Sequence, residues 1–182
     1  VSQNVRDRLS LHREGEPILR RLAKETGDSS YLIISSGHSA IVIDRYEGDN
    51  MLQMSAPIGT LLPFHVGAAP KVLLAYMPVE KREAILNEMD LEEFTPNTIT
   101  NMIVLRETLE DIRVNGYSVD EQDYEVGAYA FGAPIFNHLG EVVAAVSITT
   151  PTARCSTERR EVLIDKIKLV AREISSRLGY KI

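Results

Sequence analysis

The sequence predicts an α+β fold, in which an antiparallel sheet is flanked by N- and C-terminal helices and interrupted by a helical insert. Three observations lead to this prediction. Strand-like segments come in two groups, and short connections rich in turn-forming residues join the strands within each group. Helix-like segments separate the two groups. Amphipathic helices open and close the chain.

The opening helix is expected to end at Gly27, a natural C-terminal stop. Leu11, Ile18 and Leu22 recur on one face of this helix. The Gly-Glu-Pro sequence at 15–17 is expected to break or restart it, because proline is tolerated in a first turn but disrupts a helix interior.

The first group of strands is expected at 30–35, 40–46 and 51–55. The connections at 36–39 and 47–50 contain Gly, Ser, Asp and Asn and are short. Because a parallel crossover needs a dozen or more residues, these strands should run antiparallel to their neighbours.

The helical insert and the second group of strands complete the sheet. Helices are expected at 66–76, 78–87 and 103–115, and strands at 117–120, 128–136 and 142–149, with a hairpin at 137–140. Gly116 should close the third helix of the insert. A long final helix should begin at the N-cap Ser156 and end at Gly179. Its buried stripe is expected to be Leu163, Ile167, Val170, Ile174 and Leu178.

Composition excludes several classes of protein. The net charge is −6 and no Lys/Arg-rich patch is present, so this chain is a poor candidate to bind DNA by itself. No apolar run approaches the ~18 residues of a membrane span, and residues 1–9 lack the apolar core of a secretory signal. Cys155 is the single cysteine, which excludes an intramolecular disulfide and fits the cytoplasm.

No residue set indicates catalysis. The four histidines are far apart and none has metal-ligand spacing, so we expect no enzyme, no bound metal and no cofactor. His12, His38 and His138 are expected to be solvated. His65 is expected to brace its loop rather than to act as an acid or base.

Two other segments are candidates for binding. Asp120, Glu121, Asp123 and Glu125 could hold a metal or a ligand, although Glu121 and Glu125 fit a solvated turn better. Residues 59–75 place many small side chains where a helix begins, and free N–H groups there can bind an anion. A loop packed tightly against the sheet is an equally good interpretation of this second segment.

The same segment resembles the effector-binding domain of the IclR family of bacterial transcriptional regulators. The matching residues are Gly59, Pro63, His65, Ala68, Lys71, Leu74 and Ala75, followed by Gly116, Tyr117, Asp120, Gly127, Ala133, Pro134, Ile135 and Phe136. Thr26-Gly27, Thr95-Pro96-Asn97-Thr98 and Arg177-Leu178-Gly179 match as well, in the expected order over almost the whole chain.

The resemblance implies a GAF-like α+β domain at 14–182, preceded by the remnant of a linker helix at 1–13. It also implies an N-terminal winged-helix DNA-binding domain that is absent from this chain. The expected partners are a small organic acid as effector, further copies of the chain in a homodimer or homotetramer, and operator DNA through the missing domain only, with no membrane. The alternatives are a GAF/PAS-like module of another signalling protein and a small-molecule enzyme.

The resemblance also implies the effector contacts. They map to Ala68, Ala69, Asp120, Ala130, Ser147 and Thr149. Two positions depart from the family, because Ala130 replaces a frequent cysteine and Pro70 replaces a glycine, so that one N–H donor is lost. Tyr129, Phe131, Met51 and Met54 would favour a larger or more apolar effector, such as an aromatic or sugar acid, over glyoxylate or pyruvate. By strand alternation, however, Tyr129 and Phe131 oppose Ala130 and could instead pack against helices.

Overall fold

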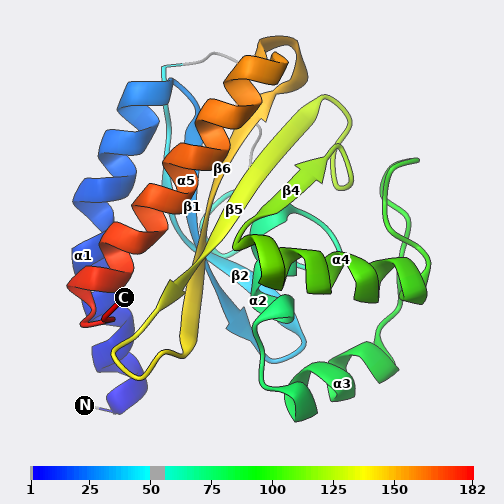
Figure 1. Cartoon of the computed structure of the whole chain (residues 1–182), viewed down its shortest axis with the longest axis horizontal. Coiled ribbons are helices and arrows are strands. Elements are labelled where there is room, and N and C mark those ends of the chain that lie inside the picture. Colours follow the sequence, from blue (N-terminus) through cyan, green and yellow to red (C-terminus); the bar gives the residue numbers. More distant parts are fainter. Residues whose placement is uncertain (1, 50–55) are drawn as a thin grey trace.

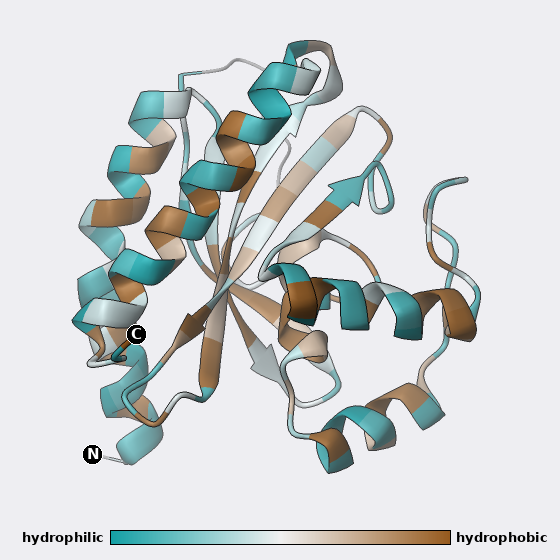
Figure 2. Cartoon of the chain, viewed as in Figure 1, coloured by the Kyte–Doolittle hydropathy of each residue, from teal (hydrophilic) through white to brown (hydrophobic). Residues whose placement is uncertain are grey.

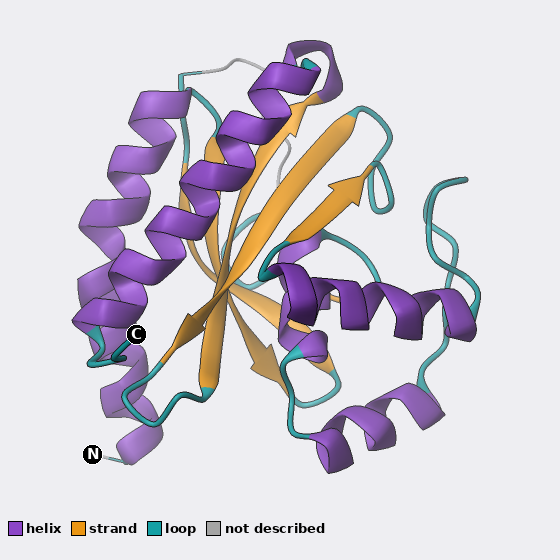
Figure 3. Ribbon diagram, in the orientation of Figure 1, coloured by secondary structure: helices purple, strands orange, loops and turns teal. Residues whose placement is uncertain are grey.

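A six-stranded antiparallel sheet, covered by helices on both faces, forms the body of the computed structural model (Figures 1 and 3). The structure describes residues 2–49 and 56–182. The helices are α1 (Gln3–Thr26), α2 (Ala68–Ala75), α3 (Val79–Glu88), α4 (Met102–Asn115) and α5 (Thr157–Arg177), with a 3-10 turn at Thr152–Arg154. The strands are β1 (Ser29–Ser36), β2 (Ser39–Tyr46), β3 (Leu61–Leu62), β4 (Ser118–Glu121), β5 (Ala128–Phe136) and β6 (Val142–Pro151). The α+β prediction is confirmed.

The two groups of strands join into one sheet in the order β3-β2-β1-β6-β5-β4. Their junction is the antiparallel pair β1–β6, in which Tyr31 lies opposite Ser147. Every pairing in the sheet is antiparallel, as the short connections predict. The strand expected at 51–55 lies outside the described residues. The short strand β3 instead falls within 59–75, where the sequence predicted a loop and a helix start.

The expected break of the first helix at 15–17 is wrong, because α1 continues through Pro17 to Thr26. Gly15 faces the core, and a Cβ built there would lie 3.8 Å from Leu32 Cδ2 and 3.9 Å from Ile174 Cδ1. Burial of this face outweighs the helix-breaking effect of proline, since most helical stability in proteins comes from tertiary packing. Gly27 closes the helix in a left-handed conformation, as predicted.

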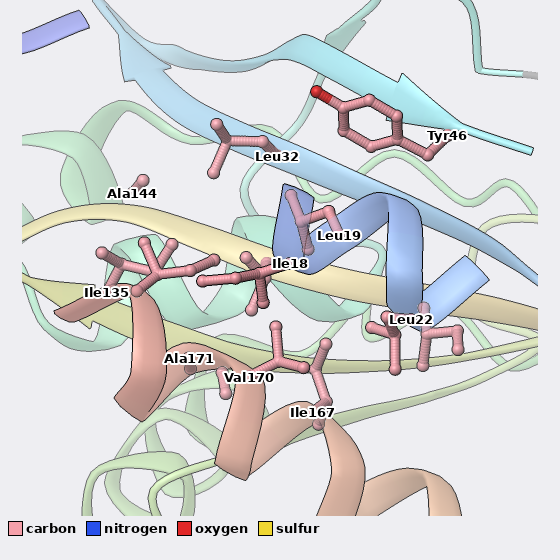
Figure 4. Packing of buried hydrophobic residues seen from close by; sticks show 14 of the residues in the cluster. Ile18, Leu19, Leu22, Leu32, Tyr46, Ile135, Ala144, Ile167, Val170 and Ala171 are labelled. Carbon is pink, nitrogen blue, oxygen red and sulfur yellow. The ribbon is translucent and has the colours of Figure 1, made fainter. Parts of the chain in front are cut away.

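Helices α1 and α5 pack side by side on one face of the sheet. Figure 4 shows Ile18 and Leu22 of α1 and Ile167 of α5 meeting the strands at this interface. Hydrophobic and hydrophilic bands alternate along both helices in Figure 2, as in helices with one buried face. The predicted stripe of α5 is buried except for Leu178, which is half-buried at the C-cap.

Helix α2 covers the other face, where it packs on β5 and β6 and against α4. All eight of its residues are buried. Gly132 in β5 permits this close approach, because a Cβ there would lie 3.0 Å from both Ala68 C and Ala69 N. The start of α2 is therefore held directly above the middle of the sheet. Within the described part of the chain, no helix is both long and apolar enough for a membrane crossing.

Candidate ligand-binding pocket

A hollow lies between the start of α2 and the sheet face beneath it. The space inside it, including open solvent at its mouth, is about 580 Å³. All six residues predicted from the family resemblance line it: Ala68, Ala69, Asp120, Ala130, Ser147 and Thr149. They come from four elements that are far apart in sequence.

The floor of the hollow comes from β5 and β6. Ala130 lies opposite Thr149, and Gly132 lies opposite Ser147, so alternation places these residues on one face of the sheet. Tyr129 and Phe131 point to the other face, where Phe131 is fully buried in the core beneath α1 and α5. These two aromatic residues therefore do not enlarge the hollow. Met51 and Met54 lie outside the described residues.

The wall opposite the floor is the first turn of α2. Gly67, with a φ of 72°, is the N-cap of α2. The N–H groups of Ala68 and Ala69 lie in the first turn, where the helix itself offers no acceptors. Pro70 occupies the third position of the same turn, where its missing N–H breaks no helical hydrogen bond. The turn therefore has two N–H donors and the positive end of a helix dipole beside the hollow.

A buried ion pair fixes the start of α2 to the segment that follows β4. Lys71 Nζ contacts Asp123 Oδ2 and also donates to the carbonyl of Val119 at 3.3 Å. Asp123 Oδ1 accepts a hydrogen bond from the N–H of Gly67 at 2.8 Å. Both charged side chains are at most 5% exposed. Sequence reasoning missed this pair: Asp123 stood only in an acidic run, and Lys71 was visible only as a motif match.

Asp120 is buried at the end of β4, with one oxygen committed to the protein. Its Oδ1 accepts the N–H of Asp123 at 2.7 Å. Burial, and next the charge of Asp123, raise the pKa of Asp120 to about 8, although Lys71 acts in the opposite direction. This raised pKa favours the protonated form of Asp120, and a side-chain hydrogen bond with Asp123 contributes to the rise. Glu121 and Glu125 are exposed, as expected. Neither simply lies in a solvated turn, however, because Glu121 belongs to β4 and pairs with Arg160, and Glu125 lines the hollow.

The rest of the hollow is mostly apolar. The residues that line this part are Tyr31, Ile33, Val42, Ala56 and Leu62, with Tyr124, Glu125 and Ala128 toward the segment after β4. Apart from Glu125 in the acidic run and Leu62 in the segment 59–75, sequence reasoning did not identify them. No group of three or more His, Cys, Asp or Glu within 2–49 and 56–182 could hold a metal ion.

His65 lies outside this hollow and braces a loop, as predicted. Its Nε2 is 2.8 Å from the carbonyl oxygen of Glu92, and the side chain is 1% exposed. His38 and His138 are exposed, as expected. His12 is half exposed but not simply solvated, because its Nδ1 lies 2.8 Å from Asp44 Oδ2.

Comparison with known proteins identifies the family. Residues 3–176 match the family model described as "Bacterial transcriptional regulator IclR C-terminal". The chain belongs to the IclR family. The HTH-type transcriptional repressor AllR of Klebsiella pneumoniae is 35% identical over 176 residues, covering 97% of this chain and 64% of AllR. The regulator KipR of Bacillus subtilis is 33% identical, covering 98% of this chain and 71% of KipR.

Solved IclR structures share the fold. The IclR protein of Thermotoga maritima superposes with a TM-score of 0.89 at 36% identity, over 93% of this chain and 69% of that one. The C-terminal domain of KdgR from E. coli superposes with a TM-score of 0.85 at 29% identity, over 94% and 99% respectively. These IclR relatives are transcriptional regulators and not enzymes. The chain spans less than two thirds of the length of AllR.

Proposed function

We propose that this IclR-family chain binds a small organic acid in the hollow beneath α2. The observation that carries the proposal is the set of hydrogen-bond donors offered by residues that line the hollow. Ala68 and Ala69, which carry free backbone N–H groups, and Asp120, Ser147 and Thr149 all line it, and the raised pKa of Asp120 favours its protonated form. Such a set suits a carboxylate, because charge-assisted hydrogen bonds at a helix N-terminus favour anions.

The body of the acid would lie over the apolar part of the hollow. Ile33, Val42 and Leu62 offer it hydrophobic contact, and with Ala130 the strand β5 adds no polar side chain to the floor. A carboxylic acid with an aromatic, branched or sugar-like body therefore suits the site better than glyoxylate or pyruvate. This preference rests on Ala130, Pro70 and the apolar lining. Tyr129 and Phe131 do not contribute to it, because they point to the other face of the sheet.

In the whole regulator, binding would change the affinity for operator DNA. We propose that an N-terminal winged-helix domain contacts the DNA, that residues 1–13 belong to the linker helix and that 14–182 form the sensing domain. AllR is described as HTH-type, and the KdgR C-terminal domain matches over 99% of its own length, which supports this division. Such a regulator would act in the cytoplasm as a homodimer or homotetramer. The acid must bind two arrangements of the subunits with different affinity for a switch to occur.

A thermal-shift screen tests the ligand class. Glyoxylate, pyruvate, benzoate, phenylacetate and gluconate represent the small, aromatic and sugar acids. A bound acid raises the melting temperature by mass action, and we expect the larger acids to do so most. Asp120→Ala and Ser147→Ala should each weaken binding about 10-fold or more, because each removes a hydrogen bond to a charged group.

Glu121→Ala is the matched control, since Glu121 neighbours Asp120 but is exposed and does not line the hollow. It should leave affinity unchanged. If no acid of the panel raises the melting temperature, or if all three variants bind as the wild type does, the proposal is wrong.

A further inference from the structure

The turn Thr95-Pro96-Asn97-Thr98 does not line the hollow, yet it is bonded to the segment that does. We call residues 120–125 the acidic segment. It supplies Asp120, Tyr124 and Glu125 to the hollow, and Asp123 to the start of α2. Within it Gln122 has a φ of 62°, a conformation that few residues other than glycine adopt. The segment therefore needs support from outside to keep this shape.

Three side chains of the turn donate hydrogen bonds to three successive carbonyls of the acidic segment. Asn97 Nδ2 donates to the carbonyl of Glu121 at 2.9 Å. Thr95 Oγ1 donates to that of Gln122 at 2.5 Å. Thr98 Oγ1 donates to that of Asp123 at 2.6 Å. The turn thus gives each of these three carbonyls a hydrogen-bond donor.

The donors are themselves held in place. Thr98 Oγ1 accepts the N–H groups of Phe94 at 3.0 Å and Thr95 at 2.9 Å, so its single proton is directed to Asp123. Thr95 Oγ1 accepts the N–H of Asn97 at 3.1 Å. Both threonines are buried. The ring of Phe94 also meets Tyr124 edge-on, with the ring centroids 5.3 Å apart.

We propose that Thr95, Asn97 and Thr98 are positioning residues for the effector pocket. They hold the acidic segment so that Asp120 and Tyr124 face the ligand while Asp123 reaches Gly67. The inference rests on the proposed function, because it assigns these residues an effect on effector affinity without contact to the effector. In the protein without ligand, we also expect the turn to restrain the acidic segment.

Hydrogen–deuterium exchange of the ligand-free protein tests the restraint. Thr98→Val removes the hydroxyl and keeps the shape, whereas Thr98→Ser keeps the hydroxyl. We expect amides of 121–127 to exchange at least 10-fold faster in Thr98→Val, and at nearly the wild-type rate in Thr98→Ser. Thr108→Val is the matched control, since the Thr108 hydroxyl donates only to the carbonyl of Val104 within α4.

Titration calorimetry with benzoate, phenylacetate and gluconate tests the effect on affinity. Thr98→Val and Asn97→Ala should weaken binding about 10-fold, and Thr98→Ser should restore it. Asn101→Ala, which removes the N-cap of α4, should lower the melting temperature without changing the dissociation constant.

Each outcome decides the inference. Unchanged exchange at 121–127 in Thr98→Val overturns it, as does an equal loss of affinity in Asn101→Ala and Thr98→Val. If none of the acids binds the wild type, the proposed function fails while the exchange comparison still decides whether the turn positions the acidic segment.

Discussion

Asp120 is the residue on which the chemistry of the pocket depends most. A carboxylate among the donors of the hollow would repel an acid, whereas a protonated carboxyl donates to it. Its raised pKa therefore has two consequences, one for stability and one for binding.

Asp120 should make stability fall as the pH rises. Its pKa is about 8 in the folded chain against an ordinary value of 3.8, so above pH 3.8 the folded state binds a proton that the unfolded state has lost. The contribution of the Asp120 proton to the free energy of unfolding is fully present below pH 3.8 and is lost as the pH rises through 8.

The substitution Asp120→Asn removes this titration and keeps an acceptor for the Asp123 N–H. The free energy of unfolding of Asp120→Asn relative to wild type should increase by about 1–4 kcal/mol between pH 5 and pH 8. Urea denaturation at both pH values measures this difference in unfolding free energy. A difference that is the same at pH 5 and pH 8 would contradict the prediction.

The buried pair of Lys71 and Asp123 should behave as a unit. Lys71→Met leaves the Asp123 charge buried without its partner and should cost about 3–5 kcal/mol of unfolding free energy. Asp123→Asn in that background removes the stranded charge and keeps an oxygen for the Gly67 N–H, so part of the loss should be recovered. A double-mutant cycle by urea denaturation checks this. Energies that add within about 0.5 kcal/mol would show that the pair is not coupled.

At this scale, family motifs identified residues that the sequence alone could not bring together. Ala68, Asp120 and Ser147 were predicted as one site, and the structure places them around one hollow. Tyr31 and Ile33 escaped prediction because β1 is buried on both faces, so no alternation marks the side toward the hollow. Asp123 escaped because nothing in an acidic run shows which carboxylate meets a lysine from a distant helix.

Among the elements, the start of α2 depends on the absence of a side chain at Gly132. A methyl group there would meet the backbone of Ala68 and Ala69 at 3.0 Å, and backbone cannot rotate away. The position of the N–H donors is therefore fixed by a residue of the strand below them.

Gly132→Ala should cost about 1–3 kcal/mol of unfolding free energy and weaken acid binding, because overpacking displaces the helix start. Gly15→Ala is the matched control: its Cβ would have ordinary contacts at 3.8 Å or more, and the site lies within α1. It should be neutral or stabilise by about 0.5–1 kcal/mol. Thermal denaturation and calorimetry compare the two variants, and equal effects would refute the role given to Gly132.

Most elements were predictable from periodicity and caps, and the exceptions have physical causes. The long helices α4 and α5 begin directly after Asn101 and Ser156, whose side chains cap them. The break predicted at Pro17 is wrong because the local cost of a proline within a helix is smaller than the stabilisation from burying the α1 face against the sheet. The strand β3 has two residues, too few for a periodic pattern.

Over the whole molecule, the sheet separates two hydrophobic cores. One lies beneath α1 and α5, and the other beneath α2 and beside α4. The hollow belongs to the second core, whereas α1, which would lead to the DNA-binding domain, belongs to the first. A signal from the effector to α1 would therefore have to cross the sheet, through strands such as β1 and β6 that contribute side chains to both cores.

Removal of residues 1–9 should leave the domain intact. The described residues of this stretch are exposed, whereas Leu11 is 3% exposed in the first core. The truncated chain should lose at most about 1 kcal/mol of unfolding free energy, and Leu11→Ala about 2–5 kcal/mol. Urea denaturation of both proteins measures these losses of unfolding free energy. Equal losses in the two proteins would mean that the exposed turns of α1 support the fold.

We propose that the first turn of α2 and the floor strand β6 bind an organic acid. Amide shifts in a proton–nitrogen NMR titration with benzoate, phenylacetate or gluconate test it most directly, because the N–H groups of Ala68 and Ala69 cannot be removed by changing side chains. We expect the largest shifts at Ala68 and Ala69, with further shifts at Ser147 and Thr149. Saturable shifts confined to other parts of the chain, or none with any of these acids, would contradict it.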